Sequence, residues 1–302
     1  MVDSDLPFRF DPWSDWISEK REELSQLDSR ASSSPDFEVA RMWLSMERRL
    51  IESKPRRVIR PESFAFESDN ELPLVEIERR AGQGRELNSF LSKRARNPFQ
   101  SDALLSDWGI HHLHLNLVLD ANDFRRRSDR LLFVRVRPEE LYFIAIGDHT
   151  SWSDVELIEV IHRNWPETIA QHCIPGLPAP RTTWSSRERQ QLRNAGRQTL
   201  VSTNDGTTYA PIGGGYTTDG SSLEVSLHLR QLIQYLEGLR NAVAESEAEI
   251  RQRCWADGVN PDELYLRLKI EDEAPYAVDE GLGVEIRLPA PGAQQSVQPA
   301  AE

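Results

Sequence analysis

The chain has 302 residues, 38% of them hydrophobic, and a formal net charge of −13 at pH 7. No run of 18 apolar residues occurs, which argues against a transmembrane helix. The N-terminus lacks the basic and apolar regions of a secretory signal, and Cys173 and Cys254 lack the spacing of a metal site. These features predict a cytoplasmic protein that does not contact a membrane.

The charge is distributed unevenly along the chain. Residues 90–137 carry nine bases against five acids, and residues 181–197 carry five bases against one acid. Residues 241–302 instead carry 13 acids and 5 bases. Because phosphate binding needs local positive charge, this pattern favours a central part that faces a polyanion. Ordinary surface variation is the alternative.

Four segments are expected from the sequence. They are an N-terminal helical extension (1–56), a central α+β core (57–200), a hairpin followed by a long helix and strands (201–290), and a disordered tail (291–302). In the first segment, apolar residues recur at helical spacing from Val39 to Leu50, and Pro55 ends the run. Short apolar pieces between polar residues predict strands or extended chain over 57–77.

The central core has the clearest pattern. It predicts strands over 110–119, 131–137 and 141–147, and then a helix opened by a capping box of Ser153 and Glu156. Such an antiparallel meander followed by a helix indicates an α+β fold, with helices covering one face of the sheet. Pro166 is expected to kink or split the helix.

The remaining segments are read from turn residues and apolar runs. "SSRERQQLRNAGRQ" predicts a basic helix, and Asn204-Asp205-Gly206 predicts a hairpin turn. Glycines 213–215 predict a mobile loop, since they lack the lysine of a phosphate-binding loop. A long helix over 222–255 and strands over 264–270 and 283–288 are expected to follow.

The stretch "GIHHLHLNLVL" places polar side chains on one face of the first strand. Side chains alternate along a strand, so His112, His114 and Asn116 share a face, about 7 Å apart, while His111 and the leucines face the core. The two histidines could bind a metal with His149, Asp148 or His162 as a third ligand, act in acid–base catalysis, or be structural. His162, beside an apolar helix stripe, is more typical of a hydrogen-bonded core residue.

Meander geometry separates two groups of candidate residues. Asp148 and His149 are expected at the far end of the first strand, away from His112. There they would lie near Arg125, Arg126, Arg127 and Arg130. These four arginines and Arg135 are expected to bind phosphate, and Asp148 and His149 are expected to bind the substrate with them. The helix after the third strand is expected to pack on the apolar face, away from His112 and His114.

The phrases "DWGIHHLHL", "RLLFVRV", "LYFIAIGDH" and "IHRNWPE" resemble an uncharacterised group of bacterial proteins over about residues 87–220. The polar sheet face is also similar in layout to small metal-free ribonucleases of the RelE and EndoU kind, which implies RNA as a substrate class but transfers no residue roles.

These observations favour a protein that binds or cleaves RNA, of the toxin or phage-defence type, without a cofactor. His112 or His114 would be the acid–base group, Asn116 would orient the substrate, and the arginines would bind phosphate. One alternative is a non-enzymatic interaction protein whose acidic C-terminal part contacts a protein partner. The other is a metal-dependent enzyme.

Overall fold

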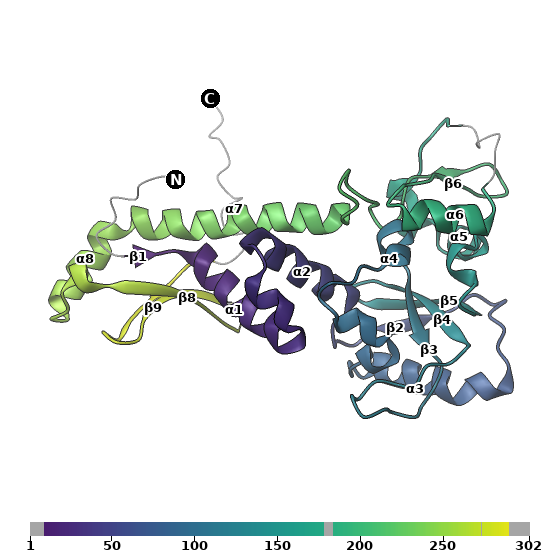
Figure 1. The fold of residues 1–302 in the computed structure, drawn as a ribbon, viewed down its shortest axis with the longest axis horizontal. Helices are drawn as coiled ribbons and strands as arrows, with labels where there is room; N and C mark the ends of the chain where they lie inside the picture. The colour runs from purple at the N-terminus through teal and green to yellow at the C-terminus, as the bar shows by residue number, and fades with distance from the viewer. Residues whose placement is uncertain (1–8, 178–183, 273, 290–302) are drawn as a thin grey trace. The chain divides into compact units, whose positions relative to one another are not determined.

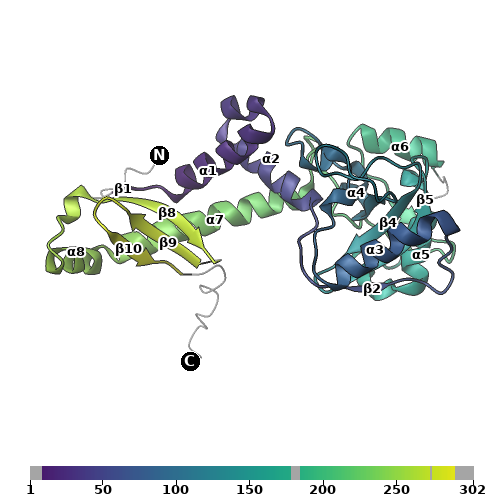
Figure 2. The same cartoon turned by 90° about the horizontal axis from the view of Figure 1, so that it is seen from below.

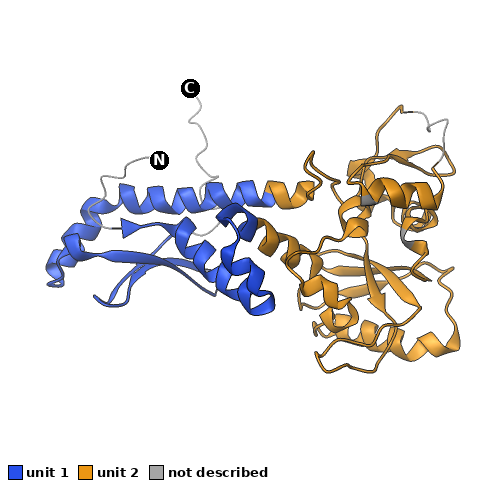
Figure 3. Cartoon of the chain, in the orientation of Figure 1, with its two compact units in different colours: residues 1–40, 228–302 blue, residues 41–227 orange. Residues whose placement is uncertain are grey.

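The computed structural model describes residues 9–177, 184–272 and 274–289 (Figures 1 and 2). Two compact units divide the chain: unit 1 holds residues 1–40 and 228–302, and unit 2 holds residues 41–227 (Figure 3). Residues 41–56 and 201–227 therefore belong with 57–200, unlike the segments expected from the sequence. The expected tail over 291–302 and Arg181 of the second basic stretch lie outside the described residues.

Unit 1 is built on a four-stranded sheet in the order β1-β8-β9-β10, in which β1 runs parallel to β8 and the other pairs are antiparallel. Its strands are β1 (Arg9–Phe10), β8 (Tyr265–Glu271), β9 (Ala274–Asp279) and β10 (Val284–Arg287). Its helices are α1 (Pro12–Leu27), α8 (Glu247–Ala256) and parts of α2 (Asp36–Arg49) and α7 (Leu223–Glu245).

The structure of unit 1 differs from the sequence prediction at one helix and one strand. The long helix expected over 222–255 is two helices, α7 and α8, which meet at Ser246. In both views α7 runs alongside the sheet (Figures 1 and 2), and its Leu236, Leu239 and Val243 are buried. Strand β9 was not predicted, because Pro275 makes its short run atypical of a strand.

Unit 2 contains a four-stranded sheet in the order β2-β5-β4-β3. Its strands are β2 (Arg57–Ile59), β3 (His111–His114), β4 (Leu131–Val136) and β5 (Glu140–Gly147). A separate two-stranded sheet is formed by β6 (Val201–Ser202) and β7 (Thr208–Tyr209). The further helices of unit 2 are α3 (Glu71–Gly82), α4 (Ala103–Trp108), α5 (Glu156–Asn164) and α6 (Ser186–Asn194). Strands β3, β4 and β5 form the antiparallel meander, β2 joins β5 in parallel, and β6 and β7 form the expected hairpin. The α+β fold class is confirmed.

Helices cover both faces of this sheet (Figure 1). On one face Ile110, Leu131 and Phe133 pack with Ile158 and Ile161 of α5. On the other, Leu113, Leu132 and Val134 pack with Leu74 and Ile77 of α3. Because β4 is apolar on both sides, each side needs a cover.

The position of α5 corrects one prediction. In the sheet His112 pairs with Phe133, and His114 pairs with Leu131, so these four residues share the face that α5 covers. The helix was expected on the opposite face.

Helix α3 corrects another prediction. Residues 71–82 are helical, and only Arg57–Ile59 of the expected extended stretch forms a strand. Leu74, Ile77 and Ala81 are spaced as on one helix face and are buried. The stretch was misread because its apolar residues are few and a proline, Pro73, stands in the first turn.

The expected capping box of Ser153 and Glu156 is absent. Helix α5 has no side-chain cap, and the Ser153 hydroxyl donates instead to Gln190 Oε1 at 2.8 Å. A capping box does open α6, between Ser185 and Glu188.

The glycine-rich loop is packed against α4 and does not hang free as expected. Gly213 N–H donates to Asp107 O at 2.9 Å, and Gly215 N–H donates to Ser106 O at 2.8 Å. A Cβ on Gly213 would lie 2.1 Å from Leu105 O, so no larger residue fits there. This backbone contact holds α4 in place beside β3.

Among the described helices, none combines the length and apolar character needed to cross a bilayer.

Candidate functional site

A pocket of about 560 Å³ in unit 2 collects most of the chemistry-bearing side chains near β3. Its volume is in the range of sites that bind a nucleotide-sized ligand. Its ionisable lining comprises His112, His114, His149, Arg49, Arg94, Arg127, Arg193, Asp102 and Tyr216. Small residues such as Ala95, Ala103 and Gly196 leave the space open.

Strand β3 ends at His114, five residues earlier than expected, and this sets the shape of the pocket. Asn116 N–H donates to His114 O at 2.9 Å, and Asn116 Oδ1 accepts the Val118 N–H at 2.9 Å. This local turn competes with the sheet ladder. Asn116 is therefore not part of the pocket lining, and the expected line of three polar side chains stops at His114.

The residues after Asn116 also depart from the prediction. Leu117 and Leu119 were expected in the core, but both are exposed. The chain has left the sheet there, so the alternation of a strand no longer applies.

The early strand end brings His149 to His114. In the sheet, His114 pairs with Leu131 and Leu131 pairs with Gly147, two residues before His149. The ring centroids of His114 and His149 are 5.9 Å apart, and those of His112 and His114 are 6.4 Å apart. The expectation that His149 belongs to a distant end of the sheet was wrong, because it assumed a strand that continued to Leu119.

Burial keeps two of these histidines neutral. It lowers the pKa of His114 to about 4, with smaller contributions from His112, His149 and Arg127. Burial also lowers the pKa of His112, partly offset by Asp102. Both imidazoles are therefore uncharged near pH 7 when the pocket holds no anion.

The polar neighbours of the two rings differ. Ser128 N–H donates to Nδ1 of His114 at 3.3 Å, so the proton of the neutral ring is on Nε2. Nδ1 of His112 lies 4.0 Å from Oδ2 of Asp102. Asp102 was not among the predicted site residues. The only signal in the sequence was its position before the apolar start of α4, which is typical of an N-cap.

Two guanidinium groups supply positive charge to the pocket. Arg94 and Arg127 line it, and no acidic side chain in the described ranges lies within ion-pair distance of either. Arg49 is buried and donates to Asn97 O at 2.8 Å and to Ala95 O at 3.2 Å. Burial lowers its pKa to about 10, so it remains charged while it holds the loop that carries Arg94.

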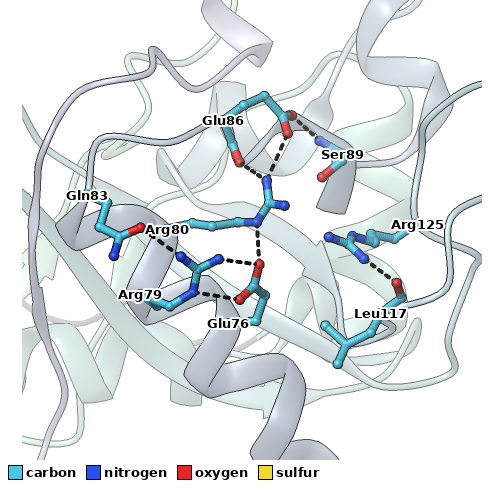
Figure 4. A network of polar contacts seen from close by, with 8 residues as sticks. All are labelled: Glu76, Arg79, Arg80, Gln83, Glu86, Ser89, Leu117 and Arg125. Carbon is cyan, nitrogen blue, oxygen red and sulfur yellow. Dashed lines mark hydrogen bonds and ion pairs between the residues drawn. The ribbon is translucent and has the colours of Figure 1, made fainter.

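Arg125 does not reach the pocket. It donates to Leu117 O, and its guanidinium lies 4.7 Å from the Phe90 ring centroid. Figure 4 shows it beside the network in which Glu76 binds Arg79 and Arg80. Arg125 therefore has a structural role.

The other predicted phosphate ligands, apart from Arg127, also lie outside the pocket lining. Arg130 pairs with Glu67, and Arg126 is exposed on the loop. Arg135 is not among the residues that line the pocket, and it donates to Thr168 O at 3.2 Å. Asp148 accepts the Thr150 N–H at 2.7 Å and closes a turn.

His162 is hydrogen-bonded at both ring nitrogens, as expected for a structural histidine. Nδ1 lies 2.8 Å from Tyr209 Oη, and Nε2 lies 3.0 Å from Asp205 Oδ2. In the part of the chain that the structure describes, no group of three or more His, Cys, Asp or Glu side chains is arranged to hold a metal ion.

One residue of the pocket lining, Arg193, belongs to a buried ion pair. Arg193 Nη2 lies 2.9 Å from Asp107 Oδ2, and the two side chains are 1% and 3% exposed. Arg193 Nη1 donates to Ser153 Oγ at 3.0 Å, and its guanidinium lies 4.4 Å from the Trp108 ring centroid. Its partner is 86 residues away in sequence, so no local pattern could predict the pair.

The two units differ sharply in charge. Unit 1 contains 24 acids and 11 bases, which gives −13, whereas unit 2 contains 25 of each. The net charge of the chain therefore says nothing against anion binding by unit 2.

The neutral histidines predict a pH-dependent stability of unit 2. Burial lowers the folded-state pKa of both His111 and His114 from 6.5 to about 4. Because the unfolded chain then binds more protons, the free energy of unfolding falls as the pH drops from about 6.5 to 4. In urea unfolding measured across this range, His111→Leu is expected to show a shallower pH dependence, and His228→Leu, at an exposed position, the wild-type dependence. An unchanged dependence in His111→Leu would contradict this account.

No family model, no curated protein and no solved structure matches this chain. The resemblances to the uncharacterised bacterial group and to RelE and EndoU ribonucleases therefore remain predictions.

Proposed function

We propose that the pocket of unit 2 binds a phosphodiester group of RNA and cleaves the RNA beside it. One observation carries the proposal: three imidazoles, with neighbouring ring centroids 5.9 and 6.4 Å apart, share a pocket with Arg94 and Arg127. We further propose that the protein acts in the cytoplasm, a compartment that suits its free thiols Cys173 and Cys254.

Phosphate recognition follows from the charges around the pocket. Arg94 and Arg127 can each donate hydrogen bonds to phosphate oxygens. Neighbouring positive groups contribute to the low pKa of His114. A bound phosphate would offset that repulsion and raise the pKa of the imidazoles, so anion binding and proton uptake would favour each other.

Cleavage needs a base and an acid on either side of one phosphate. Imidazole can do both near neutral pH. The nucleophile available within RNA itself is the 2′-hydroxyl, which DNA lacks. This chemistry fits the histidine set without a cofactor.

Unit 2, and not unit 1, is the proposed RNA-binding part. Unit 1 carries the whole net negative charge, which repels a polyanion. An acidic unit suits a basic protein partner instead.

Binding can be tested with a fluorescent single-stranded RNA by anisotropy at several salt concentrations. Arg127→Gln is expected to weaken binding about 5- to 10-fold and to reduce the log–log salt slope by about 0.7, the value for one lost phosphate contact. Arg126→Gln is the matched control, since Arg126 is the exposed neighbour outside the pocket lining. Equal weakening by both variants would mean that general loop charge, and not the pocket, binds the RNA.

A further inference from the structure

We propose that Asp102 is a positioning residue that makes His112 the general base, and that His114 serves as a neutral hydrogen-bond donor to the phosphate. This assignment rests on the proposed function and divides the roles among its histidines.

The carboxylate of Asp102 is held in place by the start of α4. Oδ1 accepts the Leu105 N–H at 2.9 Å as the N-cap, which leaves Oδ2 for His112. Helix α4 is itself fixed, because Arg48 donates to Leu105 O at 3.2 Å and to Gly213 O at 2.8 Å. Asp102 therefore offers its second oxygen from a rigid support.

The position of this oxygen decides which nitrogen of His112 carries the proton. Oδ2 lies 4.0 Å from Nδ1, while Arg127, His149 and His114 also surround the ring. A carboxylate beside Nδ1 favours the proton there and leaves the lone pair on Nε2. The separation exceeds a hydrogen bond, and such contacts commonly tighten when substrate binds.

His114 has the opposite arrangement. The Ser128 N–H at 3.3 Å occupies the lone pair of Nδ1, so Nε2 carries the proton. A ring fixed in this way has no free lone pair and cannot start as the base. It can donate its Nε2–H to a phosphate oxygen in the transition state.

The step balances as follows. Nε2 of His112 takes the proton of the 2′-hydroxyl, O2′ bonds to phosphorus, and the bond from phosphorus to O5′ breaks. O5′ takes a proton from His149 in its protonated form. The products are a 2′,3′-cyclic phosphate and a 5′-hydroxyl, and both histidines return to their starting states by exchange with water.

The Asp102→Asn variant tests the positioning role, since Asn is as good an N-cap as Asp and should preserve α4. We expect kcat for RNA cleavage to fall about 100-fold with KM nearly unchanged. The acid limb of the pH profile should move to lower pH, because the carboxylate no longer raises the pKa of His112. Asp154→Asn is the matched control, since Asp154 Oδ1 accepts the Glu156 N–H at 3.0 Å just before α5 and Asp154 lies outside the pocket lining.

Imidazole ¹⁵N NMR separates this inference from the proposed function. In wild type, His112 should show the Nδ1–H form and His114 the Nε2–H form. Asp102→Asn should lower the pKa of His112 and of His111, which the same carboxylate raises, but not that of His114. A wild type that cleaves no RNA would overturn the proposed function, whatever the tautomers are. An unchanged His112 spectrum in Asp102→Asn would overturn the inference even if RNA is cleaved.

Conservative replacement tests His114. His114→Gln keeps an N–H donor and should retain at least about 10-fold more activity than His114→Ala. Equal loss in both variants would overturn the donor role.

Discussion

Replacing Arg193 by methionine is expected to destabilise unit 2 by about 3–5 kcal/mol, the usual cost of leaving one member of a buried ion pair alone. Asp107 would lose its ion-pair partner in a site where its side chain is only 3% exposed. Burial already raises the pKa of this carboxyl, and Arg193 opposes that rise. The variant would also lose the contact of the guanidinium with Trp108 at 4.4 Å.

Urea unfolding followed by tryptophan fluorescence measures this effect. Arg187→Met, on the exposed side of the same helix, is expected to change the free energy of unfolding by less than about 0.5 kcal/mol. Adding Asp107→Leu to Arg193→Met should restore part of the stability, because the carboxylate that lost Arg193 is then removed as well. Equal stability of Arg193→Met and Arg187→Met would show that the pair does not support the pocket wall.

Replacing His112 by alanine is expected to lower RNA cleavage by about 10²–10⁴-fold, the range attributed to a general base. RNA binding should change by less than about threefold, because this neutral ring contributes little to phosphate affinity. His112→Gln preserves more of the side-chain volume and should lose as much activity, which separates lost basicity from a packing defect.

The rate of cleavage and the anisotropy of the same RNA measure both quantities. His228→Ala is the control, since His228 is exposed in unit 1. Retention of full activity in His112→Gln would exclude His112 as the base.

The parts of the fold that could be predicted are those with strong local signals. The apolar runs of β4 and β5 and the Asn204-Asp205-Gly206 turn specify the meander and the hairpin without tertiary information. The α+β class follows from their order.

The site was only half predictable, because one local turn decides its geometry. His112 and His114 stood out as polar residues on one strand face. The turn at Asn116 ended β3 early, and only that event places His149 5.9 Å from His114. Propensity favoured a continued strand through the run of Leu117 to Leu119, and a side-chain hydrogen bond prevailed.

Asp102 and Arg193 were missed for a different reason. Asp102 lies 4.0 Å from a residue ten positions later, and Arg193 pairs across 86 residues of sequence. Such contacts depend on how α4 and α6 pack in the folded unit, and this packing cannot be predicted from a single sequence. The arginine cluster was overestimated for the same reason, since only Arg127 of the five lines the pocket.

The most direct test uses a DNA oligonucleotide that contains a single ribonucleotide, incubated with the wild-type chain and analysed by mass spectrometry. We expect two products, the upstream one ending in a 2′,3′-cyclic phosphate and the downstream one in a 5′-hydroxyl, while the all-DNA oligonucleotide stays intact. An intact chimeric oligonucleotide at saturating protein, or cutting of both oligonucleotides alike, would contradict cleavage by the histidines of this pocket.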